Sequence, residues 1–198
     1  MLFPSFSGEI EEGLPVIKDR GAPWNILSSS NGGIFSQLME LVGEDGVFIH
    51  PSAKIGECVE IEGLCYIGEN AEIRHGAYLR KGSWICRDSV VGHSSEVKNS
   101  ILLPGSKAPH FNYVGDSILG KNVNLGAGTK LSNIRNDRRE ILVKIGNNER
   151  INSGLKKFGA LIGENSQLGC NVVTNPGSIL APNSMVNPNE TVTGWFQS

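Results

Sequence analysis

An aliphatic residue recurs at every sixth position through a long stretch of this 198-residue chain. In the first part of the stretch the interval is strict, and the residues are Ile49, Ile55, Ile61, Ile67, Ile73, Leu79, Ile85, Val91 and Val97. Such a period is typical of a parallel β-helix, in which three short strands and three turns form one triangular coil. Equivalent side chains then stack from coil to coil, so we expect the hydrophobic core to be a column.

The period returns further along the chain and sets the domain limits. The later positions are Leu119-Gly120, Leu125-Gly126, Ile145-Gly146, Ile162-Gly163, Leu168-Gly169, Leu180 and Val186. We therefore expect an all-β domain of roughly seven to eight coils over residues 47–198, ending in a C-terminal cap. Residues 1–46 lack the period and form an N-terminal extension, in which Phe35 to Leu41 have the spacing of a short amphipathic helix that Gly43 would end.

Three segments do not fit the period. The interval from Val97 to Leu119 is 22 residues, which is not a multiple of six, so the segment 102–111 must bulge or shift the register. The polar run 132–144 should protrude as a loop, and residues 147–160 look like an insertion or a skewed coil. Loops that leave a rigid scaffold often carry binding groups, so these segments are the first candidates for a functional site.

Composition limits the possible partners and compartments. The net charge of −2 gives no reason to expect nucleic acid or an anionic membrane as a partner, and the apolar runs are too short to span a bilayer. The four cysteines form no CxxC pair and have no metal-finger spacing. Together with the lack of a signal peptide, this leads us to expect a cytoplasmic protein with reduced thiols.

The stretch 72–133 carries motifs in a recognisable order: EIRHG, SEVKNS, GSKAPHFNYVGD and GKNVNLGAGT, followed by SN. It resembles the acetyltransferase domain of the bifunctional glucosamine-1-phosphate N-acetyltransferase/UDP-N-acetylglucosamine pyrophosphorylase. The downstream stretch SGLKKFGALIGENSQLGCNVVTNPGSIL is similar to archaeal-type sugar-phosphate nucleotidylyltransferases that carry such a domain. The resemblance implies a left-handed β-helix and a homotrimer with sites between subunits. We find no glycine-rich nucleotide loop, so no pyrophosphorylase activity is expected.

The resemblance also implies a reaction, the transfer of an acetyl group from acetyl-CoA to the amine of a hexosamine 1-phosphate. Amine acetylation needs a base for the amine proton and donors for the carbonyl oxygen, but no metal. His110, in the motif GSKAxHxxY, corresponds to the family's histidine and would act as the general base. Asn133 and Arg139 would line the reaction zone. The matches to phosphosugar-binding residues are Arg74, Lys98, Tyr113 and Asn124, and those to acetyl-CoA-binding residues are Ala127, Lys156, Lys157, Ala160 and Ser178.

Several of these assignments have competing interpretations. Arg74 and Lys98 each follow an inward aliphatic residue, one coil and one side apart, and would grip the phosphate; otherwise they are solvated corner charges. Asn124 could instead fill a turn with positive φ. Lys156 and Lys157 could be an ordinary solvated charge run. The chain also has Asn133-Ile134 in place of the family's asparagine-tyrosine pair and Arg139 in place of a lysine.

These departures leave the choice between glucosamine and galactosamine phosphate open, and they leave room for a loss of activity. The alternative is then a catalytically inactive trimeric scaffold or sugar-phosphate-binding subunit. A zinc enzyme of the carbonic anhydrase type is a further alternative, since His75 and His93 are eighteen residues apart and should stack at one corner. We disfavour it because the register shift before His110 should remove the third histidine from that corner. Sugar O-acetylation is disfavoured by the GSKAxHxxY context.

Overall fold

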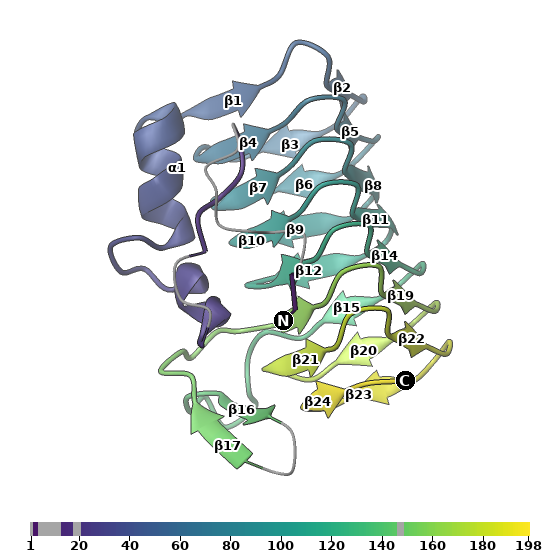
Figure 1. Ribbon diagram of the computed structural model, residues 1–198. Coiled ribbons are helices and arrows are strands. Elements are labelled where there is room, and N and C mark those ends of the chain that lie inside the picture. The colour runs from purple at the N-terminus through teal and green to yellow at the C-terminus, as the bar shows by residue number, and fades with distance from the viewer. Residues whose placement is uncertain (1, 4–12, 18–20, 146–148) are drawn as a thin grey trace.

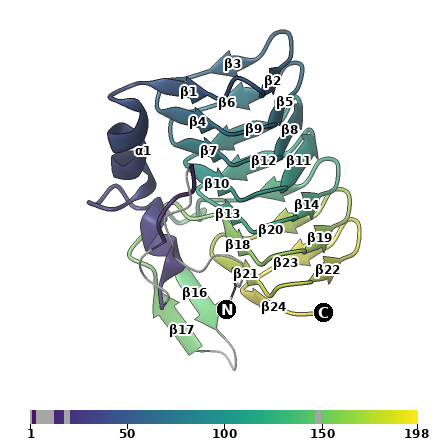
Figure 2. The same ribbon diagram turned by 45° about the horizontal axis from the view of Figure 1, so that its top comes forward.

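The chain folds as a left-handed β-helix of short parallel strands with an N-terminal segment along one side (Figures 1 and 2). The structure is a computed structural model, and it describes residues 2–3, 13–17, 21–145 and 149–198. Each coil places one strand in each of three parallel sheets, which are called sheets A, B and C in chain order. The predicted all-β solenoid is therefore confirmed.

Among the described residues, sheet A has eight strands, and sheets B and C have seven each. Sheet A contains β1 (Val47–Ile49), β4 (Cys65–Ile67), β7 (Ser83–Ile85), β10 (Ser100–Leu102), β13 (Ile118–Leu119), β18 (Ala160–Ile162), β21 (Ser178–Leu180) and β24 (Trp195–Phe196). Sheet B contains β2 (Lys54–Ile55), β5 (Glu72–Ile73), β8 (Val90–His93), β11 (Lys107–His110), β14 (Asn124–Leu125), β19 (Gln167–Leu168) and β22 (Met185–Val186). Sheet C contains β3 (Glu60–Ile61), β6 (Tyr78–Leu79), β9 (Glu96–Lys98), β12 (Tyr113–Gly115), β15 (Lys130–Leu131), β20 (Val173–Thr174) and β23 (Thr191–Val192).

The residues of the six-residue period fill the interior of the prism. Ile67, Ile73 and Leu79 are buried and belong to one continuous core that runs to Val192. Ile49, in the first coil, is 41% exposed because it has a neighbouring coil on one side only. Burial of apolar surface between coils is the main stabilising term of such a fold.

The interval of 22 residues arises from two shortened coils. Ile67 pairs with Ile85 eighteen residues later, but Ile85 pairs with Leu102 and Leu102 with Leu119, each seventeen residues later. Both deletions fall at the corner between sheets C and A, where Asn99 and Asp116 have φ values of 44° and 47°. The segment 102–111 therefore shifts in register, and it does not bulge.

A second apolar cluster covers the outer face of sheet A. Six outward residues form a ladder in register along this face: Tyr66, Trp84, Ile101, Ile118, Leu161 and Ile179. The 3-10 helix η1 (Pro23–Leu27) and helix α1 (Ile34–Val42) supply residues to this cluster, and Figure 1 shows α1 alongside the solenoid. The helix expected from Phe35 to Leu41 is thus present, and Gly43 ends it with a φ of 80°.

The segment between β15 and β18 leaves the solenoid as one excursion, which we call the insertion (residues 132–159). It contains an antiparallel hairpin of β16 (Leu142–Ile145) and β17 (Glu149–Asn152) that projects beside η1 (Figure 2). The protruding loop is confirmed, but Ile145 lies in this hairpin, so its place in the six-residue period was wrong. Gly146 and residues 147–148 lie outside the described residues. None of the described helices is long and apolar enough to cross a membrane.

Candidate functional site

Two basic side chains lie one coil apart on the outer face of sheet C. Leu79 pairs with Val97 in parallel register, so the next residues, Arg80 and Lys98, occupy equivalent positions. The Arg80 amide donates to the carbonyl oxygen of Val97 at 2.8 Å. Each basic residue follows an inward aliphatic residue and therefore points outward, as strand alternation requires. The face of sheet C thus presents a guanidinium and an ammonium group in neighbouring coils.

Arg74, the partner that the sequence suggested for Lys98, lies on sheet B. Its guanidinium donates to Glu72 of the same strand, with Nη2 and Nε at 2.9 and 3.2 Å from Oε2. The structure therefore places Arg74 and Lys98 on different faces of the prism. Arg80 was missed in the sequence analysis, although its interval of eighteen residues from Lys98 is the length of one full coil.

Acidic neighbours hold Arg80 in place. Its Nη1 donates to Glu96 Oε1 at 2.9 Å, and its Nε lies 3.8 Å from Glu62 Oε1. The hydrogen bond to Glu96 and the charges of Glu96 and Glu62 outweigh partial burial and raise the pKa of Arg80 above its ordinary value. About a third of the Arg80 side chain remains exposed, so the guanidinium can still meet a ligand.

Lys98, Tyr113 and Asn133 gather around a buried carboxylate, that of Asp116. Lys98 Nζ lies 3.7 Å from Asp116 Oδ2, and Asn133 Nδ2 donates to the same oxygen at 2.5 Å. Asn133 Nδ2 also lies 3.2 Å from the Tyr113 hydroxyl. Burial, followed by the charges of Glu96 and Asp116, raises the pKa of Tyr113, so its phenol is protonated at neutral pH and can donate a hydrogen bond.

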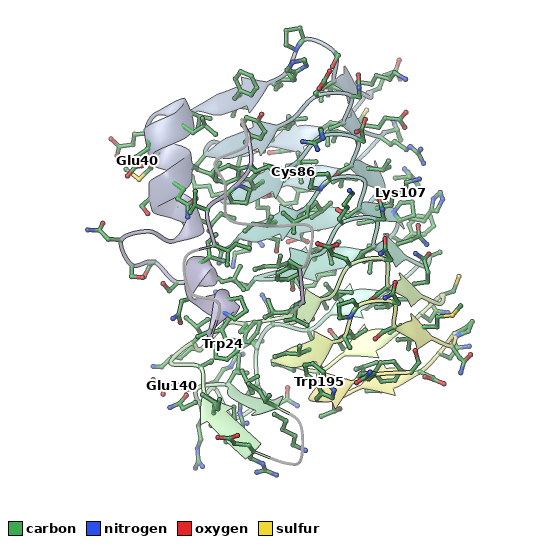
Figure 3. All side chains as sticks on the ribbon, viewed as in Figure 1. Trp24, Glu40, Cys86, Lys107, Glu140 and Trp195 are labelled. Atoms are coloured by element: carbon green, nitrogen blue, oxygen red, sulfur yellow. The ribbon has the colours of Figure 1, made fainter. Side chains whose placement is uncertain are left out.

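His110 and Asn124 lie on sheet B. His110 is exposed at the end of β11, where its backbone N–H donates to Asn112 Oδ1 at 3.0 Å. Asn112 Nδ2 in turn donates to the carbonyl oxygen of Gly126 at 2.8 Å, which fixes the corner that carries His110. Asn124 has ordinary strand geometry beside Lys107, and the turn with positive φ is made by Asn122 instead. Figure 3 shows Lys107 on the side of the prism away from α1.

Two histidines stack at the corner between sheets B and C. The rings of His75 and His93 stack at 5.4 Å, as expected, and His93 also meets the edge of Phe111 at 5.4 Å. His110 is the register partner of His93, so the expectation that the shift removes it from this corner was wrong. Among the described residues, no group of three His, Cys, Asp or Glu side chains is arranged to hold a metal ion.

The residues matched to acetyl-CoA binding differ in accessibility. Ala160 and Ser178 are register partners at the start of β18 and β21, and both are fully buried. The Ser178 hydroxyl donates to the carbonyl oxygens of Asn175 and Val192, so neither residue offers a surface atom to a ligand. Ala127 is half-buried, and within the described chain its N–H has no acceptor.

The insertion begins and ends at the Asp116 cluster. Asn133 lies where the chain leaves the solenoid, and its carbonyl oxygen accepts the N–H of Phe158 at 2.8 Å where the chain returns. Lys156 and Lys157 precede Phe158 and are exposed. Arg139 is exposed on the outgoing arm, and its N–H donates to Asp137 Oδ1 at 3.2 Å. The expected site residues therefore lie on all three sheets and on the insertion, with Ala160 and Ser178 on sheet A.

Comparison with known proteins gives a consistent picture. The family model described as the GMPPB C-terminal domain matches residues 43–135. A bifunctional sugar-1-phosphate nucleotidylyltransferase/acetyltransferase of Sulfurisphaera tokodaii is 37% identical over 192 residues, covering 88% of this chain and 45% of the relative. The bifunctional protein GlmU of Methanococcus aeolicus is 34% identical over 189 residues, with 86% and 43% covered. The chain thus spans about half the length of the curated relatives it matches.

Solved structures resemble the chain more distantly. A hexapeptide transferase family protein of Anaplasma phagocytophilum is 18% identical, covers 75% of this chain and 74% of its own, and has a TM-score of 0.40. A putative acetyltransferase of Bacillus cereus is 18% identical, with 77% and 75% covered and a TM-score of 0.42. The resemblance expected from the sequence is confirmed: the chain is homologous to the C-terminal part of bifunctional sugar-1-phosphate nucleotidylyltransferase/acetyltransferases.

Proposed function

We propose that the chain transfers an acetyl group from acetyl-CoA to the amine of a hexosamine 1-phosphate. The observation that carries this proposal is the arrangement on sheet C, where Arg80 and Lys98 lie one coil apart next to Tyr113 and Asn133. Two cations in neighbouring coils suit a phosphate, because a guanidinium binds it bidentately and an ammonium adds a point charge. The tyrosine and asparagine supply donors and acceptors for sugar hydroxyls and the amine.

In this mechanism the neutral amine attacks the thioester carbonyl directly. His110 takes a proton from the nitrogen as the C–N bond forms, and the proton passes to the CoA sulfur as the C–S bond breaks. The N–H of Ala127, which has no acceptor within the described residues, suits the carbonyl oxygen as negative charge develops on it. The N–H of Gly126 cannot do this, because it donates to the carbonyl oxygen of Leu168 at 2.7 Å.

The insertion is suited to the phosphates of acetyl-CoA. It contains seven Lys and Arg residues and three Asp and Glu residues, whereas the remainder of the chain has eleven basic and seventeen acidic residues. The insertion thus has a net charge of +4 on a chain that is otherwise negative. Lys156 and Lys157 are exposed on its returning arm and would contribute to this attraction.

A homotrimer would complete the site from two chains. The outer face of sheet A is covered by the N-terminal segment and the insertion, so sheets B and C are the faces open to another copy. The proposed groups divide between these faces, with His110 on sheet B and Arg80 and Lys98 on sheet C. Docking sheet B of one protomer against sheet C of the next would bring the base to the phosphosugar.

The test is release of free CoA thiol from acetyl-CoA in the presence of four acceptors: glucosamine 1-phosphate, galactosamine 1-phosphate and the two unphosphorylated sugars. We expect release with one or both phosphosugars and little with the free sugars, because the cation pair contributes only when phosphate is present. If no thiol is released with any of the four acceptors but calorimetry shows that a phosphosugar binds, the result would instead support the inactive binding subunit. Equal rates with free and phosphorylated sugars would contradict the proposed phosphate site.

A further inference from the structure

Asp116 carries a buried negative charge at a corner whose geometry does not require one. It is 3% exposed and adopts a φ of 47° where sheet C turns into sheet A. Asn99 makes the equivalent turn one coil earlier, with a φ of 44° and a neutral side chain. Asparagine and aspartate can both adopt this conformation. A buried charge is costly unless it is paired, so the carboxylate calls for another explanation.

The explanation lies in the donors that converge on this carboxylate. Asn99 Nδ2 donates to Oδ1 at 2.7 Å, and Asn133 Nδ2 donates to Oδ2 at 2.5 Å. Lys98 Nζ, 3.7 Å from Oδ2, balances the charge. Asn99 also donates to the carbonyl oxygen of Leu27 at 3.1 Å, which ties the cluster to the N-terminal segment. Both carboxylate oxygens are thus occupied by amide donors from the coils on either side.

This arrangement decides which end of the Asn133 amide faces the site. The orientation of an asparagine amide is set by its hydrogen-bond network. Asn133 Nδ2 faces the carboxylate and the Tyr113 hydroxyl, which leaves Oδ1 as the group available to a ligand. A carbonyl oxygen accepts hydrogen bonds and cannot donate them. It would therefore orient the substrate amine through one of its N–H groups.

We propose that Asp116 is a positioning residue that fixes the Asn133 amide with its carbonyl oxygen toward the substrate amine. This inference rests on the proposed acetyl transfer. Asp116 does not touch the substrate itself and acts through Asn133. Its backbone contributes to the same end, because the Asp116 carbonyl oxygen accepts the N–H of Gly159 at 2.8 Å and so closes the root of the insertion next to Asn133.

The kinetic test uses Asp116→Asn, which keeps the size and the turn preference of the residue. The variant offers one acceptor oxygen to the two amide donors, and its own NH₂ group must face a donor. Misplacing a substrate-orienting group by about 1 Å can cost on the order of 100-fold in rate, so we expect kcat to fall about 10- to 100-fold. Asp88→Asn is the matched control, because Asp88 also lies at a corner with a φ of 59° but pairs with Asn70. The control should stay within about twofold of the wild type, as expected for independent surface sites.

A double-mutant cycle then asks whether Asp116 acts through Asn133. In an Asn133→Ala background we expect Asp116→Asn to cost less than about threefold further, because its target is already gone. The comparison uses kcat at saturating phosphosugar, so that a change in phosphate binding through Lys98 does not enter. The proposal would be overturned if the losses of kcat in the two single variants multiplied in the double variant, or if kcat were unchanged in Asp116→Asn.

A second measurement does not depend on turnover. Crystal structures of Asp116→Asn and Asp116→Ala should show the Asn133 side chain rotated away from the Tyr113 hydroxyl in at least the alanine variant. An Asn133 Nδ2 that stays within 3.5 Å of Tyr113 in both variants would overturn the proposal. If no phosphosugar supports thiol release by the wild type, the acetyl-transfer assignment fails, and these structures still decide whether Asp116 positions Asn133.

Discussion

The side-chain amide of Asn133 donates a hydrogen bond of 3.2 Å to the hydroxyl oxygen of Tyr113, one coil before it. This contact joins the outer face of sheet C to the point where the insertion leaves the solenoid. It places the polar groups of sheet C at the base of the most basic segment of the chain. A phosphosugar on sheet C and an acyl donor attracted by the insertion would therefore meet next to these two residues.

Replacing His110 by alanine should abolish most of the acetyl transfer without unfolding the protein. A general base contributes on the order of 100- to 10,000-fold to the rate, and an exposed side chain contributes little to stability. Thiol release and thermal unfolding of His110→Ala measure the two effects. His75→Ala is the control, because His75 is exposed at the same corner and should be dispensable. Near-normal turnover in a folded His110→Ala protein would contradict the assignment of His110 as the base.

Arg80 and Arg74 should differ in their effect on phosphosugar binding. We expect Arg80→Ala to raise the KM for the phosphosugar at least 10-fold, because a charge-assisted hydrogen bond contributes about 1.5–3 kcal/mol. Arg74→Ala should change it by less than twofold, since Arg74 pairs with Glu72 on another face. Steady-state kinetics of the two variants check this. A larger effect from Arg74 would mean that the phosphate lies on sheet B.

Raising the pH above 9 should lower the free energy of unfolding, because the thiol of Cys65 is buried. Burial raises its pKa to about 12 from the ordinary value of 9.0. Above pH 9 the unfolded chain loses this proton while the folded chain keeps it, so the stability contribution is complete below pH 9 and is lost as the pH rises toward 12. The slope approaches about 1.4 kcal/mol per pH unit.

Urea unfolding of the wild type and Cys65→Ala at pH 7–10.5 measures this effect. The stability difference between the two proteins should shrink above pH 9, since other titrating groups cancel in the comparison. A constant difference between wild type and Cys65→Ala across the range would contradict the assignment. Protein concentration must be held fixed, because oligomers unfold in a concentration-dependent way.

Trp24 should be a main stabilising contact of the N-terminal segment. It is 3% exposed, and its ring lies 6.1 Å from that of Phe158, at the returning end of the insertion. Removing a buried Trp side chain costs about 3–5 kcal/mol. Figure 3 marks Trp24 beside the insertion and Trp195 in the last coil. Trp195→Ala is the control, since Trp195 is 38% exposed and should cost less than half as much in thermal unfolding. Equal losses would mean that the N-terminal segment is not anchored through Trp24.

Much of the fold was predictable because one rule repeats along the chain. The inward positions from Ile67 to Val97 were identified by period alone, since side chains alternate along each strand and coils repeat. The helix around Leu38 and the loop after Leu131 were also recognisable, the first from its amphipathic spacing and the second from its polar run. Ile145 was wrongly assigned to the six-residue period, because the sequence alone does not distinguish an apolar residue in a hairpin from one in a coil.

The candidate site was less accessible to sequence reasoning. His110, Tyr113 and Asn133 were identified by motif, but nothing in the motif indicated that Asp116 links Asn133 to Lys98. The burial of Ala160 and Ser178 was also hidden, because small residues are common both at ligand-facing surfaces and at buried corners.

The sequence by itself determined the repeating interior. With one aliphatic residue in every six, the short strands bury these side chains together only when each of them faces the inside of a coil. The tertiary structure alone decided the register of the corners. One residue is lost at Asn99 and another at Asp116, and these losses set which polar groups share a face. Side chains distant in sequence meet only after the coils have stacked, and therefore the contact of Asn133 with Asp116 belongs to the fold. The pairing of Lys98 with Arg80 instead follows from the regular interval of eighteen residues.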